Sequence, residues 1–179
     1  MITIKSTLTS TQKDLPAYAG VYNNIFRVPA AKVQSLLSLE SGFNRILVSV
    51  NGNPPLHRSL MPDGRGGYFI LLNREQLKNY GLAAGDEVQL VLERDLSEYG
   101  MPLPEELAEI WSFDDAAREA FHRLKPGRQR RMIHLVATPK GAQTRAKKAV
   151  QISEYLKQTG GVLDYKELNA FIKNDNANR

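Results

Sequence analysis

The sequence predicts an α+β protein, in which a β-rich first half forms a small barrel or sandwich and the second half is helical. Three observations predict this division. Short runs that alternate apolar and polar residues, separated by turn residues, occur throughout residues 2–93. From Pro104 onward the apolar residues recur about every 3.6 positions, which is typical of helices. The 179 residues suffice for two small domains, which we expect at residues 1–97 and 98–179.

The first half is expected to form short strands, because its apolar runs have period two or are rich in β-branched residues. These strands are predicted at Ile2–Leu8, Tyr22–Val28, Arg45–Val50, Leu56–Met61, Tyr68–Leu72 and Glu87–Glu93. Short helices are predicted at Ala30–Leu37 and Arg74–Tyr80. The glycine-rich stretch Gly64–Gly67 leads into a strand and not into a helix, so it predicts a hairpin turn instead of a phosphate-binding loop. Many short strands with little helix between them are typical of a small barrel or sandwich.

The second half is expected to form helices that proline and glycine residues separate. They are predicted at Glu105–Trp111, Asp114–Leu124, Arg128–Ala137, Ala142–Gln158 and Tyr165–Lys173, followed by a frayed tail over residues 174–179. Ser112 and Asp115 have the spacing of a capping box at the start of the second helix. The only tryptophan, Trp111, is expected to fill the helical core.

Several motifs of the helical half occur in an order that resembles the bacterial YdeI/OmpD-associated family over about residues 102–158. The matching stretches are Pro104-Glu105-Glu106-Leu107, Asp115–Phe121, Leu124-Lys125-Pro126, Arg130-Arg131, Ile133, and Lys140 with Thr144–Lys148. The sequence departs from the family pattern at Gly127, where the family has serine, and at Pro139, where it has alanine. The family label implies a link to bacteriocin protection or envelope stress and implies no particular reaction.

Motifs of the first half resemble the uncharacterised domain that often precedes this helical domain. The matching stretches are Val28-Pro29, Val50-Asn51-Gly52, Ser59–Pro62, Gly66-Gly67-Tyr68 and Gly85–Val88. This resemblance implies a small closed β-barrel of the double-split type, similar to the barrels of AbrB- and MazE-like proteins.

The residue content excludes several kinds of chemistry. The chain has no cysteine, so disulfides, thiolate metal sites and thiol nucleophiles are excluded. The three histidines lie far apart in sequence, and Ser59 lacks the glycines of a nucleophile elbow. We therefore expect no cofactor, no metal and no enzymatic activity. The N-terminus has no apolar core of a signal peptide and no stretch is long enough to span a bilayer, so we predict a cytoplasmic protein without membrane insertion.

Positive charge is concentrated in one window of the helical half. Residues 118–148 carry ten basic side chains and one acidic side chain, a net charge of +9, whereas residues 101–117 carry five acids and no base. The predicted partner-binding residues are Arg128, Arg130, Arg131, Lys140, Thr144, Arg145 and Lys148. The alternative is a solvated face on which some of the bases neutralise the acids. In that case Thr144 caps its helix and Arg145 pairs with Asp114 or Asp115.

The leading prediction is therefore a non-enzymatic cytoplasmic bacterial protein that binds an anionic or protein partner through a basic helical surface. The alternative is a nucleic-acid-binding protein, which the AbrB-like barrel and the basic helices together suggest. No aromatic residues interleave with the bases, which argues against a stacking platform for single strands.

Overall fold

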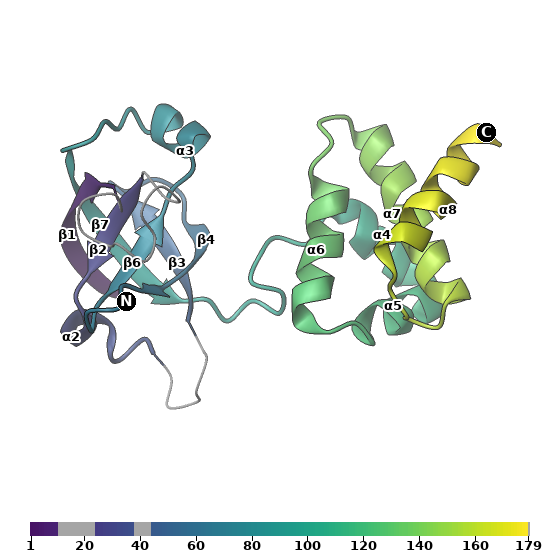
Figure 1. Cartoon of the computed structure of the whole chain (residues 1–179), viewed down its shortest axis with the longest axis horizontal. Coiled ribbons are helices and arrows are strands. Elements are labelled where there is room, and N and C mark those ends of the chain that lie inside the picture. The colour runs from purple at the N-terminus through teal and green to yellow at the C-terminus, as the bar shows by residue number, and fades with distance from the viewer. Residues whose placement is uncertain (11–23, 38–43, 179) are drawn as a thin grey trace. The chain divides into compact units, whose positions relative to one another are not determined.

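The computed structural model describes residues 1–10, 24–37 and 44–178. The chain divides into two compact units, Met1–Gly100 and Met101–Arg179, which we call the barrel unit and the helical unit (Figure 1). The predicted fold class, α+β with an N-terminal barrel followed by helices, is confirmed.

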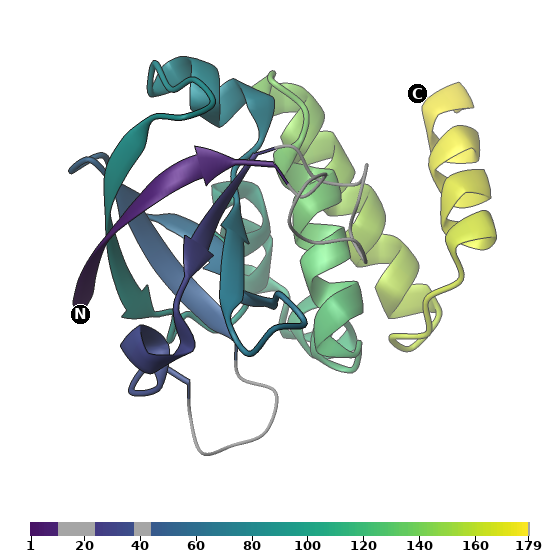
Figure 2. The same cartoon turned by 60° about the vertical axis from the view of Figure 1, so that its left-hand side comes forward.

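The barrel unit contains a seven-stranded sheet in which every neighbouring pair is antiparallel. In chain order the strands are β1 (Ile2–Thr9), β2 (Ile25–Val28), β3 (Arg45–Val50), β4 (Leu56–Ser59), β5 (Met61–Pro62), β6 (Tyr68–Leu71) and β7 (Glu87–Arg94). Their order in the sheet is β4-β3-β7-β1-β2-β6-β5. The helices α2 (Ala30–Val33) and α3 (Arg74–Asn79) lie at opposite ends of the barrel, as Figures 1 and 2 show.

The sheet is nearly closed because its two end strands follow each other in the chain. Only Leu60 separates β4 from β5, so the same segment pairs with β3 and then with β6. Leu60 is fully buried, and its N–H donates to the carbonyl of Asn44 at 2.8 Å. The segment Leu56–Met61, predicted as a single strand, thus forms β4 and the start of β5, which pair with different strands. Strand propensity alone does not indicate this division.

The interior of the barrel is built by alternation along the strands, as the sequence predicts. Val88, Leu90 and Leu92 on β7 are at most 2% exposed, and the residues between them are more exposed. The same alternation occurs on β3, where Ile46 and Val50 are each 1% exposed. Burial of each such aliphatic side chain stabilises the fold by about 1.5–3 kcal/mol. The alternating strands therefore supply the apolar core that stabilises the barrel.

The glycine-rich segment forms the predicted hairpin between β5 and β6. Gly64 and Gly66 have φ angles of 73° and 84°, which are favourable for glycine. The Asp63 carboxylate accepts from the N–H groups of Arg65 and Gly67, each at 2.8 Å. The loop's own carboxylate therefore occupies the N–H groups that a phosphate would need.

Two predicted elements of the barrel unit differ from the structure. The predicted helix Ala30–Leu37 ends at Val33, because the chain then turns so that Leu36 is also buried in the core. Within the predicted strand Tyr22–Val28 the described strand is β2, and residues 22–23 lie outside the described residues.

The helical unit contains α4 (Glu105–Phe113), α5 (Asp115–His122), α6 (Pro126–Ala137), α7 (Ala142–Gln158) and α8 (Tyr165–Ala177). The other four helices all contact α7, which is the centre of the unit (Figure 1). Trp111 is 7% exposed, and its ring centroid lies 4.7 Å from that of Phe121, so its predicted place in the core is confirmed. Among the described residues, no helix is long and apolar enough to cross a membrane.

The caps of two helices differ from the prediction. The N-cap of α5 is Asp114, whose side chain accepts from the N–H of Ala117 at 2.9 Å. Ser112 instead lies in the last turn of α4 and donates to the carbonyl of Glu109, so the predicted capping box is wrong. Helix α6 begins at Pro126, two residues earlier than predicted, because proline is well suited to a first helical position.

The last helix is longer than predicted because a buried glutamine on α7 holds its end. Gln151 is 3% exposed and donates to the side chains of Asp175 (2.7 Å) and Asn176 (3.0 Å). Helix α8 therefore continues to Ala177, and the predicted frayed tail is wrong for residues 174–177.

Candidate functional site

The predicted partner-binding residues lie near the two ends of α6. Arg128, Arg130 and Arg131 lie in its first turns, whereas Lys140, Thr144, Arg145 and Lys148 lie in the connection to α7 and in the first turns of α7. A helix of 12 residues is about 18 Å long, so these residues form two groups at separate places.

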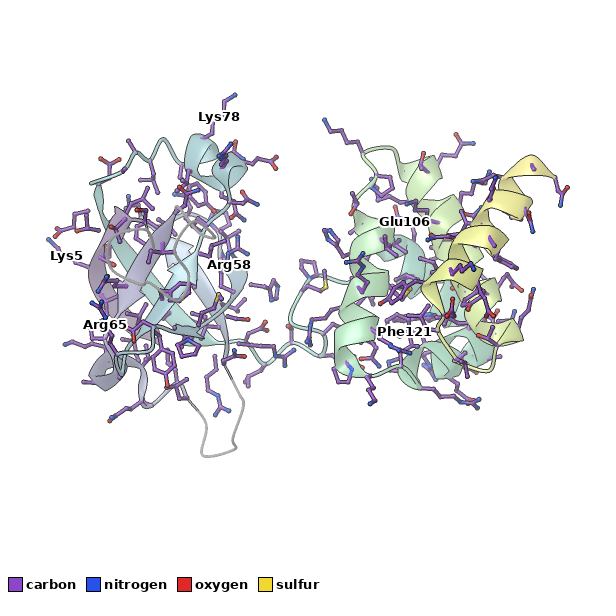
Figure 3. The ribbon with its side chains drawn as sticks, viewed as in Figure 1. Lys5, Arg58, Arg65, Lys78, Glu106 and Phe121 are labelled. Carbon is purple, nitrogen blue, oxygen red and sulfur yellow. The ribbon has the colours of Figure 1, made fainter. Side chains whose placement is uncertain are left out.

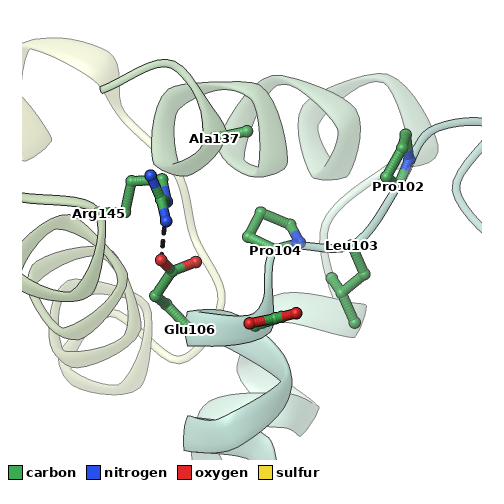
Figure 4. A pocket seen from close by; sticks show the side chains of 7 residues that line it. Pro102, Leu103, Pro104, Glu106, Ala137 and Arg145 are labelled. Atoms are coloured by element: carbon green, nitrogen blue, oxygen red, sulfur yellow. Dashed lines mark hydrogen bonds and ion pairs between the residues drawn. The ribbon is translucent and has the colours of Figure 1, made fainter. Parts of the chain in front are cut away.

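Arg145 forms the main contact of the second group. Its Nε donates to Glu106 Oε1 at 2.7 Å (Figure 4). Its Nη1 donates to the carbonyl of Lys140 at 3.0 Å. The two charged side chains are 29% and 15% exposed. Arg145 thus joins the first turn of α4 to the connection between α6 and α7.

The partner that we predicted for Arg145 was wrong. Asp114 pairs with Lys157 at 2.8 Å, and Asp115 pairs with Arg118 at 3.0 Å. Glu106 replaces them because it lies in the first turn of α4, and the start of α7 packs near that turn. The motif Pro104–Leu107 and the motif Thr144–Lys148 therefore meet in space.

A shallow pocket of about 370 Å³ adjoins this ion pair. Its lining consists of this pair, Glu105, Ala137 and residues 102–104. The wall therefore combines apolar side chains with the neutralised pair and the exposed carboxylate of Glu105 (Figure 4). Lys140 and Thr144 are exposed. The N-cap of α7 is Gly141 and no side chain caps this helix end, so the predicted cap by Thr144 is wrong. Lys148 is half-buried.

The carboxylates of this region are held in their charged form. The backbone N–H of Glu106 lowers the pKa of its carboxyl most strongly, burial opposes this effect, and Arg145 adds to it. The pKa of Asp114 is lowered mainly by its hydrogen bond from Lys157. The pKa of Lys157 is raised in turn by hydrogen bonds to Asp114 and Glu154.

These shifts predict that acid destabilises the helical unit. A carboxyl whose folded-state pKa lies below its ordinary value stabilises the fold above that value and loses this contribution as the pH falls. The ordinary values are 4.5 for Glu106 and 3.8 for Asp114, so the melting temperature is expected to fall between about pH 5 and pH 2. Trp111 fluorescence measures this transition, because Trp111 lies in the core of the unit.

The variant Glu106→Gln is expected to show a weaker dependence on pH over this range than the original protein. Glu109→Gln is the matched control, because Glu109 is an exposed glutamate of the same helix without an ion pair among the described residues. Equal pH dependence in the original protein and in Glu106→Gln would show that the Glu106–Arg145 pair does not contribute.

No described residue is an acidic partner of the first group of arginines. Arg123 Nη1 donates to the carbonyl of Gly160, and Arg128 Nη1 donates to the carbonyl of Leu163, each at 3.2 Å. The guanidinium carbon of Arg131 lies 5.9 Å from the ring centroid of Tyr165. Arg130 is exposed on the same helix. Of the ten bases in residues 118–148, Arg118 and Arg145 pair with carboxylates, and the other eight form no ion pair with the residues that the structure describes.

A polar cluster around the buried Asp95 in the barrel unit was not predicted from the sequence. His57 Nδ1 lies 2.8 Å from Asp95 Oδ2, and Ser97 donates to Asp95 Oδ1 from its N–H (2.9 Å) and its hydroxyl (2.5 Å). Burial alone raises the pKa of Asp95, which is 1% exposed, but the hydrogen bonds from His57 and Ser97 outweigh it and the pKa is lowered. No motif spacing indicates this cluster, because His57 lies on β4 and Asp95 follows β7, and β3 lies between these two strands in the sheet. Among the described residues, no three side chains gather as a metal site.

Comparison with known proteins confirms both resemblances. Residues 101–159 match the family described as bacteriocin-protection, YdeI or OmpD-associated. Residues 17–92 match a domain of unknown function, DUF1905. No match was found among curated proteins or among solved structures. The first match includes the Glu106–Arg145 pair and Arg128, Arg130 and Arg131 of α6.

Proposed function

Because the helical unit matches the YdeI/OmpD-associated family, we propose that this is a non-enzymatic bacterial protein that binds an anionic or protein partner through the basic surface of that unit. The proposal locates it in the cytoplasm and, through the family label, in bacteriocin protection or envelope stress. The barrel unit is then a scaffold or a second binding surface.

One observation carries the proposal: eight bases of residues 118–148 have no carboxylate partner among the described residues. Arginine suits such a surface, because its planar guanidinium donates two parallel hydrogen bonds to a carboxylate or phosphate. The barrel unit lacks this excess, since residues 1–100 carry ten bases and nine acids.

The proposal that the protein is non-enzymatic is supported by the contacts of the charged and polar side chains that could otherwise act as catalytic groups. Glu106 and Arg145 neutralise each other beside the pocket. His57 and Ser97 both bind the carboxylate of Asp95 and thereby fix the chain that follows β7. These contacts join secondary structure elements, which is a structural role.

The proposal predicts that neutralising the arginines of α6 weakens binding to a polyanion. The probe is a fluorescein-labelled peptide of glutamate residues, measured by fluorescence anisotropy against increasing protein concentration. Removing three positive charges from this surface is expected to weaken binding at least about tenfold at low salt. The variant carries the substitutions Arg128→Gln, Arg130→Gln and Arg131→Gln.

A control variant removes the same charge from exposed residues of the barrel unit, two of which are labelled in Figure 3. It carries Arg65→Gln, Arg74→Gln and Lys78→Gln. If both variants lose the same affinity, net charge rather than the helical surface binds the probe, and the proposed function is wrong.

A DNA duplex tests the nucleic-acid alternative in the same assay. If about five bases contacted phosphates, log K would fall with log salt at a slope near −4.5. No binding of duplex at roughly 50 mM salt rules the alternative out.

A further inference from the structure

Three arginines of the helical unit converge on the short segment that connects α7 to α8. Arg123 contacts the carbonyl of Gly160, Arg128 contacts the carbonyl of Leu163, and Arg131 lies over the ring of Tyr165. These contacts all fall within residues 160–165, so the three guanidinium groups lie along one segment of six residues. We call the three arginines together with Val162 and Tyr165 the arginine corner.

Most hydrogen-bonding capacity of these guanidinium groups is unused. Each group has five N–H donors, and the contacts of Arg123 and Arg128 are single bonds to neutral carbonyls. All three side chains are exposed, and none forms an ion pair with a described residue. Three positive charges along one segment, none of them in an ion pair with a described residue, favour the approach of an anion.

The connecting segment is held rigidly in place. Gly160 and Gly161 have φ angles of 61° and 85°. A Cβ atom on Gly161 would lie 2.6 Å from the carbonyl oxygen of Ala120 and 2.8 Å from Arg123 Cβ. The segment therefore packs directly against α5, so its backbone needs little ordering when a partner binds.

Apolar surface lies beside the charges. Val162 is 68% exposed and Tyr165 is 42% exposed. Arginine and tyrosine are the residues that most often dominate binding energy at protein interfaces, where apolar contact and desolvated hydrogen bonds act together. A partner that bears only charge would leave Val162 uncovered.

Acidic residues bound the corner on the α8 side. Asp164 accepts from the N–H groups of Lys166 and Glu167, and Glu167 is exposed in the same first turn. The backbone of a nucleic acid presents a continuous row of phosphates and needs a continuous positive track. A compact site with neighbouring acids and an exposed valine suits a short peptide better.

We infer that the arginine corner is the docking site for an acidic segment of a protein partner, whose carboxylates bind Arg123, Arg128 and Arg131 and whose apolar side chain covers Val162 and Tyr165. The inference rests on the proposed function, and it specifies the binding site within the helical unit and the class of partner.

The test compares two neighbouring arginines that carry the same charge. Arg131 lies over Tyr165, whereas the exposed Arg130 forms no hydrogen bond or ring contact with residues 160–165. Arg130→Gln is therefore the matched control for Arg131→Gln. The probe is a labelled peptide of glutamates with one central phenylalanine. Arg131→Gln is expected to weaken binding at least about fivefold, and Arg130→Gln less than about twofold.

A second comparison tests the apolar part. Val162→Ser is expected to weaken the peptide with phenylalanine and to leave unchanged a peptide with glycine in its place. Arg131 and Val162 are exposed, so neither substitution is expected to unfold the unit, and circular dichroism verifies this.

The outcomes separate the inference from the proposed function. If the original protein binds the peptide and Arg130→Gln and Arg131→Gln lose the same affinity, the arginine corner is not the docking site. The basic surface as a whole then remains the binding site. No binding of either peptide by the original protein overturns both. A DNA duplex that displaces the peptide at equal charge overturns the assigned class of partner.

Discussion

Replacing Phe121 by alanine is expected to lower the free energy of unfolding of the helical unit by about 3–5 kcal/mol. Phe121 is 1% exposed, and its ring contacts Trp111 at 4.7 Å and His122 at 5.6 Å between centroids. The residue lies on α5 where that helix packs against α7 (Figure 3). Alanine leaves a cavity that a small helical core cannot fill, so the melting temperature should fall by more than about 12 °C.

Phe113→Ala is the matched control for this substitution. Phe113 is 74% exposed at the end of α4, so the same chemical change is expected to alter stability by less than about 0.5 kcal/mol. Urea unfolding measured by Trp111 fluorescence compares the two variants, because Trp111 is the only tryptophan of the chain. Similar losses in both would mean that the packing of α5 against Trp111 does not stabilise the unit.

Replacing Asp95 by alanine is expected to destabilise the barrel unit by about 2–3 kcal/mol, because charge-assisted hydrogen bonds are lost and their donors remain partly buried. The carboxylate binds His57 and Ser97 on two sides and is 1% exposed. Without it, the chain after β7 loses its attachment to β4. Hydrogen exchange of peptides from β3 and β7 measures the loss.

Glu93→Ala is the control for Asp95, since it removes the same charge from an exposed position on β7. The pH dependence adds a second criterion. Because the folded-state pKa of Asp95 lies below its ordinary 3.8, its contribution is present above about pH 4 and disappears as the pH falls through the folded value. In Asp95→Asn the stability of the barrel unit should therefore fall less steeply with decreasing pH than in the original protein. An unchanged dependence of stability on pH would contradict this account.

Most of the secondary structure follows from local patterns in the sequence. The period-two alternation of β7 and the period of about 3.6 in α7 are both signals within a single element, so the strand and the helix Ala142–Gln158 were predicted closely. Predictions failed where a distant residue decides the outcome. Helix α8 extends beyond Lys173 because Gln151 binds Asp175 and Asn176, and no local signal shows this.

The candidate site shows the same division. The excess of positive charge in residues 118–148 is a property of the sequence, but the contacts of each base depend on how the helices pack. Arg145 binds Glu106, 39 residues away, instead of the aspartates that we predicted. The contacts of Arg123 and Arg128 with the carbonyls of residues 160 and 163 depend on the path of the connecting segment, which backbone propensities do not define.

The way in which the sheet closes has a consequence for self-association. Residues 56–62 cover the outer edge of β3 with one end and the outer edge of β6 with the other, so a single stretch protects both edges. A proteolytic cut or an insertion at Leu60 would free both edges together. Unpaired strand edges pair readily with other chains, so such a variant is prone to exchange this segment between copies and to form swapped dimers or larger aggregates.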